Sequence, residues 1–143
     1  MKELVYAVNN AIATSLGLPF ENIHNESIEE GLVVPAAFVF VEHVERYDML
    51  GDKSQQRIHF DIAYLDDTSN RAELLDIIDK MHRGLFLLEM PDGSLKRANK
   101  GIEWDIGDDA VVHGKAAYNI TTDIAVDTEK VETMTQDRSI TKE

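Results

Sequence analysis

The stretch RIHFDIAYL, residues 57–65, constrains the fold more than any other part of the sequence, because apolar and polar side chains alternate strictly in it. One parity carries Ile58, Phe60, Ile62 and Tyr64, and the other carries Arg57, His59 and Asp61. Successive side chains of a β-strand point to opposite faces, so the pattern predicts a strand with one buried face and one polar face. A one-residue slip in pairing would expose all four large apolar side chains, and the pattern therefore also fixes the register.

The polar side of this strand allows three interpretations: a reaction centre, a metal site, or polar residues that face solvent or another subunit. His59 and Asp61 would lie about 6–7 Å apart along the strand. A metal ion would need further ligands, such as His43 and Glu45 from a neighbouring strand. The five histidines show no HxH or HExxH spacing, and the chain has no nucleophile elbow or phosphate-binding glycine loop. We therefore predict no catalytic, metal-binding or cofactor-binding residue, and expect Arg57, His59 and Asp61 to be solvated or to pair across the sheet or with another subunit.

The remaining periodicities predict two helices, three further strands and a polar loop. The helices are expected over residues 1–16, capped by Gly17, and within 66–90, capped by Thr68, Ser69 or Asn70; the strands over 38–44, 102–106 and 112–126; and the loop over 46–55. The order α-β-β-α-β-β predicts one α/β domain of the α+β class, a four-stranded, mainly antiparallel sheet with both helices on one face. The other face is expected to stay partly open, with apolar side chains such as Val39, Val41 and Val111, and is a candidate interface.

Composition narrows the functional classes. The chain has 143 residues, which suits one domain, and its 14 Lys+Arg against 27 Asp+Glu give a net charge of −13. A surface this acidic does not favour sequence-specific nucleic-acid binding, which draws on basic side chains. The absence of cysteine, of an apolar run of about 20 residues and of a secretion signal predicts a protein made in the cytosol with no membrane span. We expect a domain over residues 1–127 and a polar tail over 128–143, mobile or ordered only in an assembly.

Four stretches in a fixed order resemble a known family. They are MKELVYAVNNAI, EEGLVVPAAFVFV, RIHFDIAYL and the segment from PDGSL to NITT. The first motif is matched by Glu29 or Glu30, Gly31, Leu32, Pro35 and Phe38; the strand motif by Phe60, Asp61, Ile62 and Tyr64; and the hairpin motif by Asp92 and Gly93. Together they resemble the tail terminator (tail completion) proteins of long-tailed phages and prophages, in the branch common in Gram-positive hosts.

The resemblance implies a structural protein of the virion tail, assembled in the host cytoplasm. Such proteins form a ring, typically of six copies, that stops growth of the tail tube and then meets head or neck proteins. The implied partners are other copies of the chain, the tail tube, possible sheath proteins and the head–neck connector, with DNA passing through the ring. Subunit contacts are expected at Arg46, Leu50, Lys53, Arg57, His59 and Asp61. The acidity would repel DNA from the lumen or merely keep the protein soluble. The alternatives are a head–tail connector and, from another class, an enzyme or small-ligand-binding domain.

Overall fold

Two α-helices and seven strands make up the regular structure of the described chain. The computed structural model describes residues 1–28, 31–48, 53–68 and 70–123. The elements are α1 (Lys2–Leu16), the short 3-10 helix η1 (Phe20–Asn22), β1 (Ile23–His24), β2 (Ala36–Asp48), β3 (Lys53–Leu65), α2 (Arg71–Phe86), β4 (Leu87–Glu89), β5 (Leu95–Arg97), β6 (Glu103–Ile106) and β7 (Val112–Asp123).

Helix α1 forms where its apolar period predicts it. Leu4, Val8 and Ile12 are each at most 1% exposed, as expected for the buried stripe of an amphipathic helix. The helix ends at Gly17, whose backbone is left-handed with φ of 69° and whose N–H donates to the Ala13 carbonyl. Glycine adopts this conformation without steric cost, so the predicted cap is confirmed.

Helix α2 is capped by Asn70, one of the three residues proposed for this role. The Asn70 side chain accepts hydrogen bonds from the backbone N–H groups of Ala72 (2.9 Å) and Glu73 (3.4 Å). These contacts satisfy two of the four donors that the first turn leaves unpaired. The helix ends at Phe86, so the expectation of helix up to residue 90 is wrong.

The residues after α2 form a hairpin, as the Asp92–Gly93 motif of the family resemblance implied, although periodicity alone predicted helix up to residue 90. Strands β4 and β5 pair antiparallel as a separate two-stranded sheet. Between them, the Gly93 N–H donates to the Met90 carbonyl (2.8 Å), and Gly93 has φ of 89°. The turn predicted at residues 91–93 is thus present, and it closes the hairpin. The short apolar run at 85–88 suits a helix or a strand equally well by periodicity, and Leu88 is fully buried as a strand residue.

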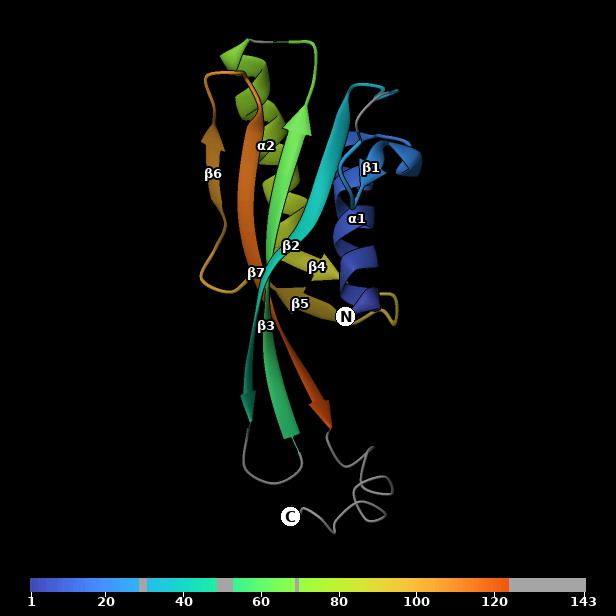
Figure 1. Cartoon of the computed structure of the whole chain (residues 1–143), viewed down its shortest axis with the longest axis vertical. Coiled ribbons are helices and arrows are strands. Elements are labelled where there is room, and N and C mark those ends of the chain that lie inside the picture. Colours follow the sequence, from blue (N-terminus) through green and yellow to red (C-terminus); the bar gives the residue numbers. More distant parts are fainter. Residues whose placement is uncertain (29–30, 49–52, 69, 124–143) are drawn as a thin grey trace. The chain divides into compact units, whose positions relative to one another are not determined.

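The main sheet has five strands in the order β1-β2-β3-β7-β6. The prediction of a four-stranded, mainly antiparallel sheet is wrong in strand number, because β1 is a fifth strand. It pairs with β2 in parallel, with Ile23 opposite Ala37. Only two residues form β1, too few for any periodic signal. Both helices lie on one face of the sheet, as predicted (Figure 1). The chain is therefore a single α+β domain with a mixed five-stranded sheet and a small two-stranded one.

Strands β2 and β3 are longer than expected. Strand β2 runs to Asp48 and β3 starts at Lys53, so most of the predicted loop over 46–55 is strand. Arg46 and Lys53 therefore lie on strands, whereas Leu50 lies outside the described residues. The side chains of Glu45 to Asp48 are polar or aromatic and show no apolar alternation. The strand continues there because β2 lies beside β3 in the sheet, which no local pattern indicates.

Close contacts group the chain into two compact units. The first comprises Met1–Val44 and Ile58–Tyr118, and the second comprises Glu45–Arg57 and Asn119–Glu143. The core of the first unit includes Phe60 and Tyr118, whose rings meet edge to face with centroids 6.1 Å apart. The Tyr118 hydroxyl donates to the Leu85 carbonyl, which ties β7 to α2. Burial raises the pKa of the Tyr118 hydroxyl well above its usual range, so it remains a donor.

Two expectations concern the end of the chain and membranes. The predicted boundary at residue 127 and the tail over 128–143 lie outside the described residues. In the described chain, neither helix is long and apolar enough to cross a bilayer.

Candidate functional site

The polar face of β3 carries the residues singled out from the sequence. On the opposite face, Ile58, Phe60, Ile62 and Tyr64 are at most 3% exposed, as the alternation predicts. Asp61 on the polar face approaches His113 of β7, with 3.8 Å between Oδ1 and Nδ1. The same Oδ1 is buried and accepts no hydrogen bond from the described residues. A carboxylate oxygen without a donor is unfavourable when buried, and each such atom needs an explanation.

An ion pair between Lys115 and Glu42 lies in the same unit of the chain. Lys115 Nζ donates to Glu42 Oε2 at 2.7 Å, although the two residues are 73 positions apart. The hydrogen bond to Glu42 raises the pKa of the Lys115 ammonium, which is already charged at neutral pH. Both side chains are about half exposed, so the pair adds little to stability by itself. The Lys115 charge is therefore largely compensated by the Glu42 carboxylate.

A pocket of about 310 Å³ opens beside these charges. Its lining residues are Asp61, Glu103, Trp104, Asp105, His113 and Lys115. Three of the six are carboxylates and one is a lysine that Glu42 partners. The pocket is therefore suited to a basic group rather than to an anion.

His43, which the metal interpretation would bring together with His59 and Asp61, lies beside His59 alone. The rings of His43 and His59 lie 5.3 Å apart between centroids, but Asp61 faces His113 instead. Within the described ranges, no three His, Cys, Asp or Glu side chains are grouped as a metal ion requires. Two imidazole rings tilted by 44° on adjacent strands are an ordinary cross-strand pair.

In the second unit, Arg57 is the centre of a small network. Its Nε donates to Asn119 Oδ1 at 3.2 Å, and its Nη1 lies 3.7 Å from Glu45 Oε1. The guanidinium also lies 5.7 Å from the centre of the Tyr47 ring. Arg46, separately, donates from Nε to Ser54 Oγ at 3.1 Å. Pairing across strands, one of the roles expected for Arg57, is thus observed in this unit.

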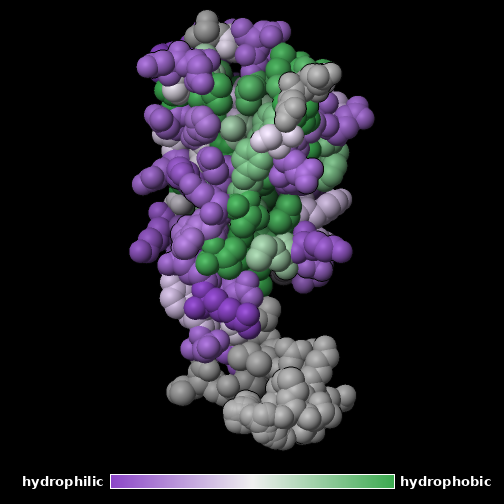
Figure 2. Space-filling model, viewed as in Figure 1, coloured by the Kyte–Doolittle hydropathy of each residue, from purple (hydrophilic) through white to green (hydrophobic). Residues whose placement is uncertain are grey.

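Apolar side chains are exposed on part of strand β2. Val41 and Val44 are 42% and 41% exposed, whereas Val39 is only 1% exposed. The expectation that Val39 lies on an open face is therefore wrong, because residues 36–39 are buried without alternation. Figure 2 shows hydrophobic side chains gathered in a band with hydrophilic side chains on both sides.

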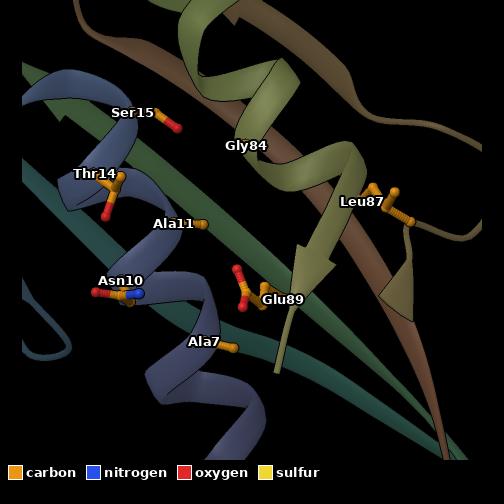
Figure 3. Close-up of a pocket in the computed structure, with 8 residues that line it drawn as sticks. All are labelled: Ala7, Asn10, Ala11, Thr14, Ser15, Gly84, Leu87 and Glu89. Carbon is orange, nitrogen blue, oxygen red and sulfur yellow. The ribbon is translucent and has the colours of Figure 1, made fainter. Parts of the chain in front are cut away.

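A second hollow lies between the two helices. It measures about 270 Å³ and is lined by Ala7, Asn10, Ala11, Thr14, Ser15, Gly84, Leu87 and Glu89. In Figure 3 the Glu89 carboxylate points from β4 toward α1, and Gly84 faces the turn that carries Ser15. A Cβ at Gly84 would collide with Ser15 Oγ and lie 3.3 Å from the Ala11 carbonyl oxygen. The small residues thus serve the close approach of the helices.

The residues that carry the family resemblance lie at turns and in the core. Gly31 has φ of 79°, Phe38 is 8% exposed, and Pro35 directly precedes β2. Asp92 Oδ1 accepts from the Ser94 hydroxyl (2.6 Å) and backbone N–H (2.9 Å), and these bonds lower the pKa of the Asp92 carboxyl. Glu29 and Glu30 lie outside the described residues.

The structure adds residues that the sequence reading did not single out. Glu103, His113 and Lys115 lie around Asp61, although they are about 40 to 55 positions away from it in the chain, and Glu42 joins this group through Lys115. The sequence does show that His113 and Lys115 alternate with the apolar residues Val112 and Ala116 along β7. Which strand lies beside β3 was not visible from any local pattern.

Comparison with known proteins assigns the family. A family model described as "Phage tail terminator protein" matches residues 3–132, which is most of the chain. The chain belongs to the phage tail terminator family. As a terminator, it is a structural protein of the virion tail.

The curated proteins contain no match to this terminator. Among solved structures, a chain from one described as "Virion of native gene transfer agent (GTA) particle" is 12% identical, with 85% of this chain and 96% of that chain covered. The TM-score of this pair is 0.49.

Proposed function

We propose that copies of this chain close into a ring, expected to be hexameric, that caps the tail tube at its final length and then joins the tail to the head or neck. The observation that carries this proposal is the match of residues 3–132 to the phage tail terminator family. The partners would be other copies of the chain, tail-tube and sheath subunits, and connector proteins, with DNA passing through the ring without sequence-specific contacts.

The surface chemistry supports a role in assembly. Val41 and Val44 expose apolar area next to charged side chains, as at the edges of many protein interfaces. The Asp61 side chain is 30% exposed, so its carboxylate could accept a hydrogen bond from another subunit. We propose subunit contacts at Arg46, Lys53, Arg57, His59 and Asp61, at Leu50, and through the tail over 128–143, with residues 1–127 as the folded domain.

The test is a tube-length experiment. Purified tail-tube subunits are polymerised with increasing amounts of this protein, and tube lengths are measured in negative-stain images. A terminator shortens the tubes and narrows their length distribution, and a ring is visible at one tube end. Light scattering after size-exclusion chromatography gives the mass of the protein alone and of the capped complex.

Two results would contradict the proposal. Tubes of unchanged length without rings at their ends would exclude capping. Binding to purified connector or head particles without any effect on tube growth would instead indicate a head–tail connector. A monomer in isolation does not contradict the proposal, because the monomers can assemble into a ring when they meet the tube. The measurement therefore needs the tube.

A further inference from the structure

Strand β6 is an open edge of the main sheet. Within the described part of the chain it pairs with β7 alone and is last in the strand order, and Figure 1 draws no labelled strand beyond it. The Gly107 N–H donates to the Val111 carbonyl, so the backbone of Gly107 points toward β7. Because backbone groups alternate in direction along a strand, those of Trp104 and Ile106 point away from β7, toward the open edge. These groups can pair with an added strand.

Strand β5 is a second open edge, in the same unit of the chain. Among the strands that the structure describes, it pairs with β4 alone. Just beyond β5 the Asn99 N–H donates to the Ala117 carbonyl of β7, so the open part of this edge is Leu95–Arg97. The Met90 N–H donates to the Ser94 carbonyl, so Ser94 points toward the β4 side. By the same alternation, the backbone groups of Leu95 and Arg97 point away from β4. Leu95 is also 62% exposed, an unusual value for a large apolar side chain on a strand.

The two edges carry opposite charges. Glu103 and Asp105 are exposed on β6, where the pocket that includes Asp61 adds a further carboxylate. The segment SLKRANK, residues 94–100, contains Lys96, Arg97 and Lys100 and no acidic residue, in a chain with a net charge of −13. Opposite charges on neighbouring strands stabilise their pairing, and like charges oppose it. This complementarity favours β5 of a second copy as the partner of β6.

We propose that β6 of one copy pairs with β5 of the next copy, so that the sheet continues from subunit to subunit. This inference rests on the proposed ring. The contact uses two different patches of each chain, and a contact of this kind closes into a ring when the rotation between subunits allows it. The Arg97 side chain would then reach the carboxylates of β6 and of the pocket beside it.

Charge reversal with rescue tests the pairing. One variant carries Glu103→Lys with Asp105→Lys, and a second carries Arg97→Glu with Lys100→Glu. Each alone is expected to raise the concentration needed to cap half of the tubes by at least about tenfold, since like charges then face each other. The variant with all four changes restores the complementarity and is expected to cap tubes like the unaltered chain. A control for the first variant, Glu26→Lys with Asp79→Lys, raises the net charge by the same amount at two exposed sites away from the edge.

A backbone test complements the charge test. Ile106→Pro removes an N–H that points to the open edge and takes no part in the ladder with β7, so the fold is expected to persist. Ile106→Ala removes the side chain but retains the N–H. Tube capping is expected to be lost with proline and retained with alanine, with thermal unfolding of both variants measured first.

Each outcome decides the inference. Capping by the unaltered chain together with capping by both single-edge variants would overturn the β5–β6 pairing and leave the proposed function intact. Loss of capping in the control, or failure of the fourfold variant to recover, would overturn it as well. If the unaltered chain never caps tubes, the proposed function falls and this inference falls with it. If Ile106→Pro unfolds, the rescue experiment alone decides.

Discussion

At Gly114 of β7, the Trp104 ring occupies the space that a side chain would need. The two residues are paired across β6 and β7. A Cβ at Gly114 would meet three carbons of the ring, with Cε3 at 2.6 Å and Cη2 at 2.9 Å. The indole N–H donates to His82 Nδ1 at 3.1 Å, which holds the ring in place against α2. A glycine that would weaken an ordinary strand is thus required here by a packed neighbour.

We expect Gly114→Ala to lower the free energy of unfolding by about 1–3 kcal/mol, as overpacking usually does. Urea unfolding followed by the fluorescence of the single tryptophan gives the value. The control is a double-mutant cycle with Trp104→Leu, measured by circular dichroism. If Gly114→Ala costs as much without the ring as with it, the collision is not the cause.

At the scale of elements, the cap of α2 is defined by one side chain. Asn70 Oδ1 accepts from the N–H groups of Ala72 and Glu73, and no other residue proposed as the cap and described by the structure does so. We expect Asn70→Ala to destabilise the fold by about 1 kcal/mol and Asn70→Asp to retain most of the stability. Thermal unfolding measures both. Equal losses in the two variants would show that the side-chain oxygen does not act as the cap.

The crossing of α1 and α2 is set by Gly84. Replacement by alanine requires the Ser15 hydroxyl to rotate, while the Ala11 carbonyl oxygen at 3.3 Å has to yield only slightly. Alanine also gains about 1 kcal/mol of helix propensity over glycine. We therefore expect Gly84→Ala to change stability by less than about 1 kcal/mol and Gly84→Val to cost about 2 kcal/mol or more.

Urea unfolding of the two variants checks this expectation. Ser15→Ala in the Gly84→Ala background removes the colliding hydroxyl and is expected to be at least as stable as Gly84→Ala alone. A Gly84→Val variant as stable as the unaltered protein would mean that the helices separate easily.

At the scale of the whole molecule, the polar face around Asp61 separates folding from assembly. Asp61 Oδ1 receives no hydrogen bond from the described chain, and His113 Nδ1 lies 3.8 Å away, so the loss of this oxygen breaks no hydrogen bond of the fold. We expect Asp61→Ala to unfold at nearly the same urea concentration as the unaltered chain but to cap tail tubes less effectively. The control is Asp67→Ala, an exposed carboxylate outside the cluster. Ring formation and capping unchanged by Asp61→Ala would mean that this face is only solvated.

Most of the secondary structure was predictable because its causes are local. Amphipathic periods, the Gly17 cap and the alternation in β3 arise from residues within a few positions of each other. The errors lie where local patterns are ambiguous or too short. The apolar residues 85–88 suit either element, β1 has two residues, and the ends of β2 and β3 depend on cross-strand partners.

The sequence by itself determined the α+β class, both helices, the buried face of β3 and the family of the chain. Only the tertiary structure decided which strands are neighbours, and with them the site. Glu42 and Lys115, or Asp61 and His113, meet because β7 lies beside β3 in the sheet order. Strand order follows from how complete faces pack together, which no window of the sequence contains. The open, oppositely charged edges of β5 and β6 also exist only in the folded chain.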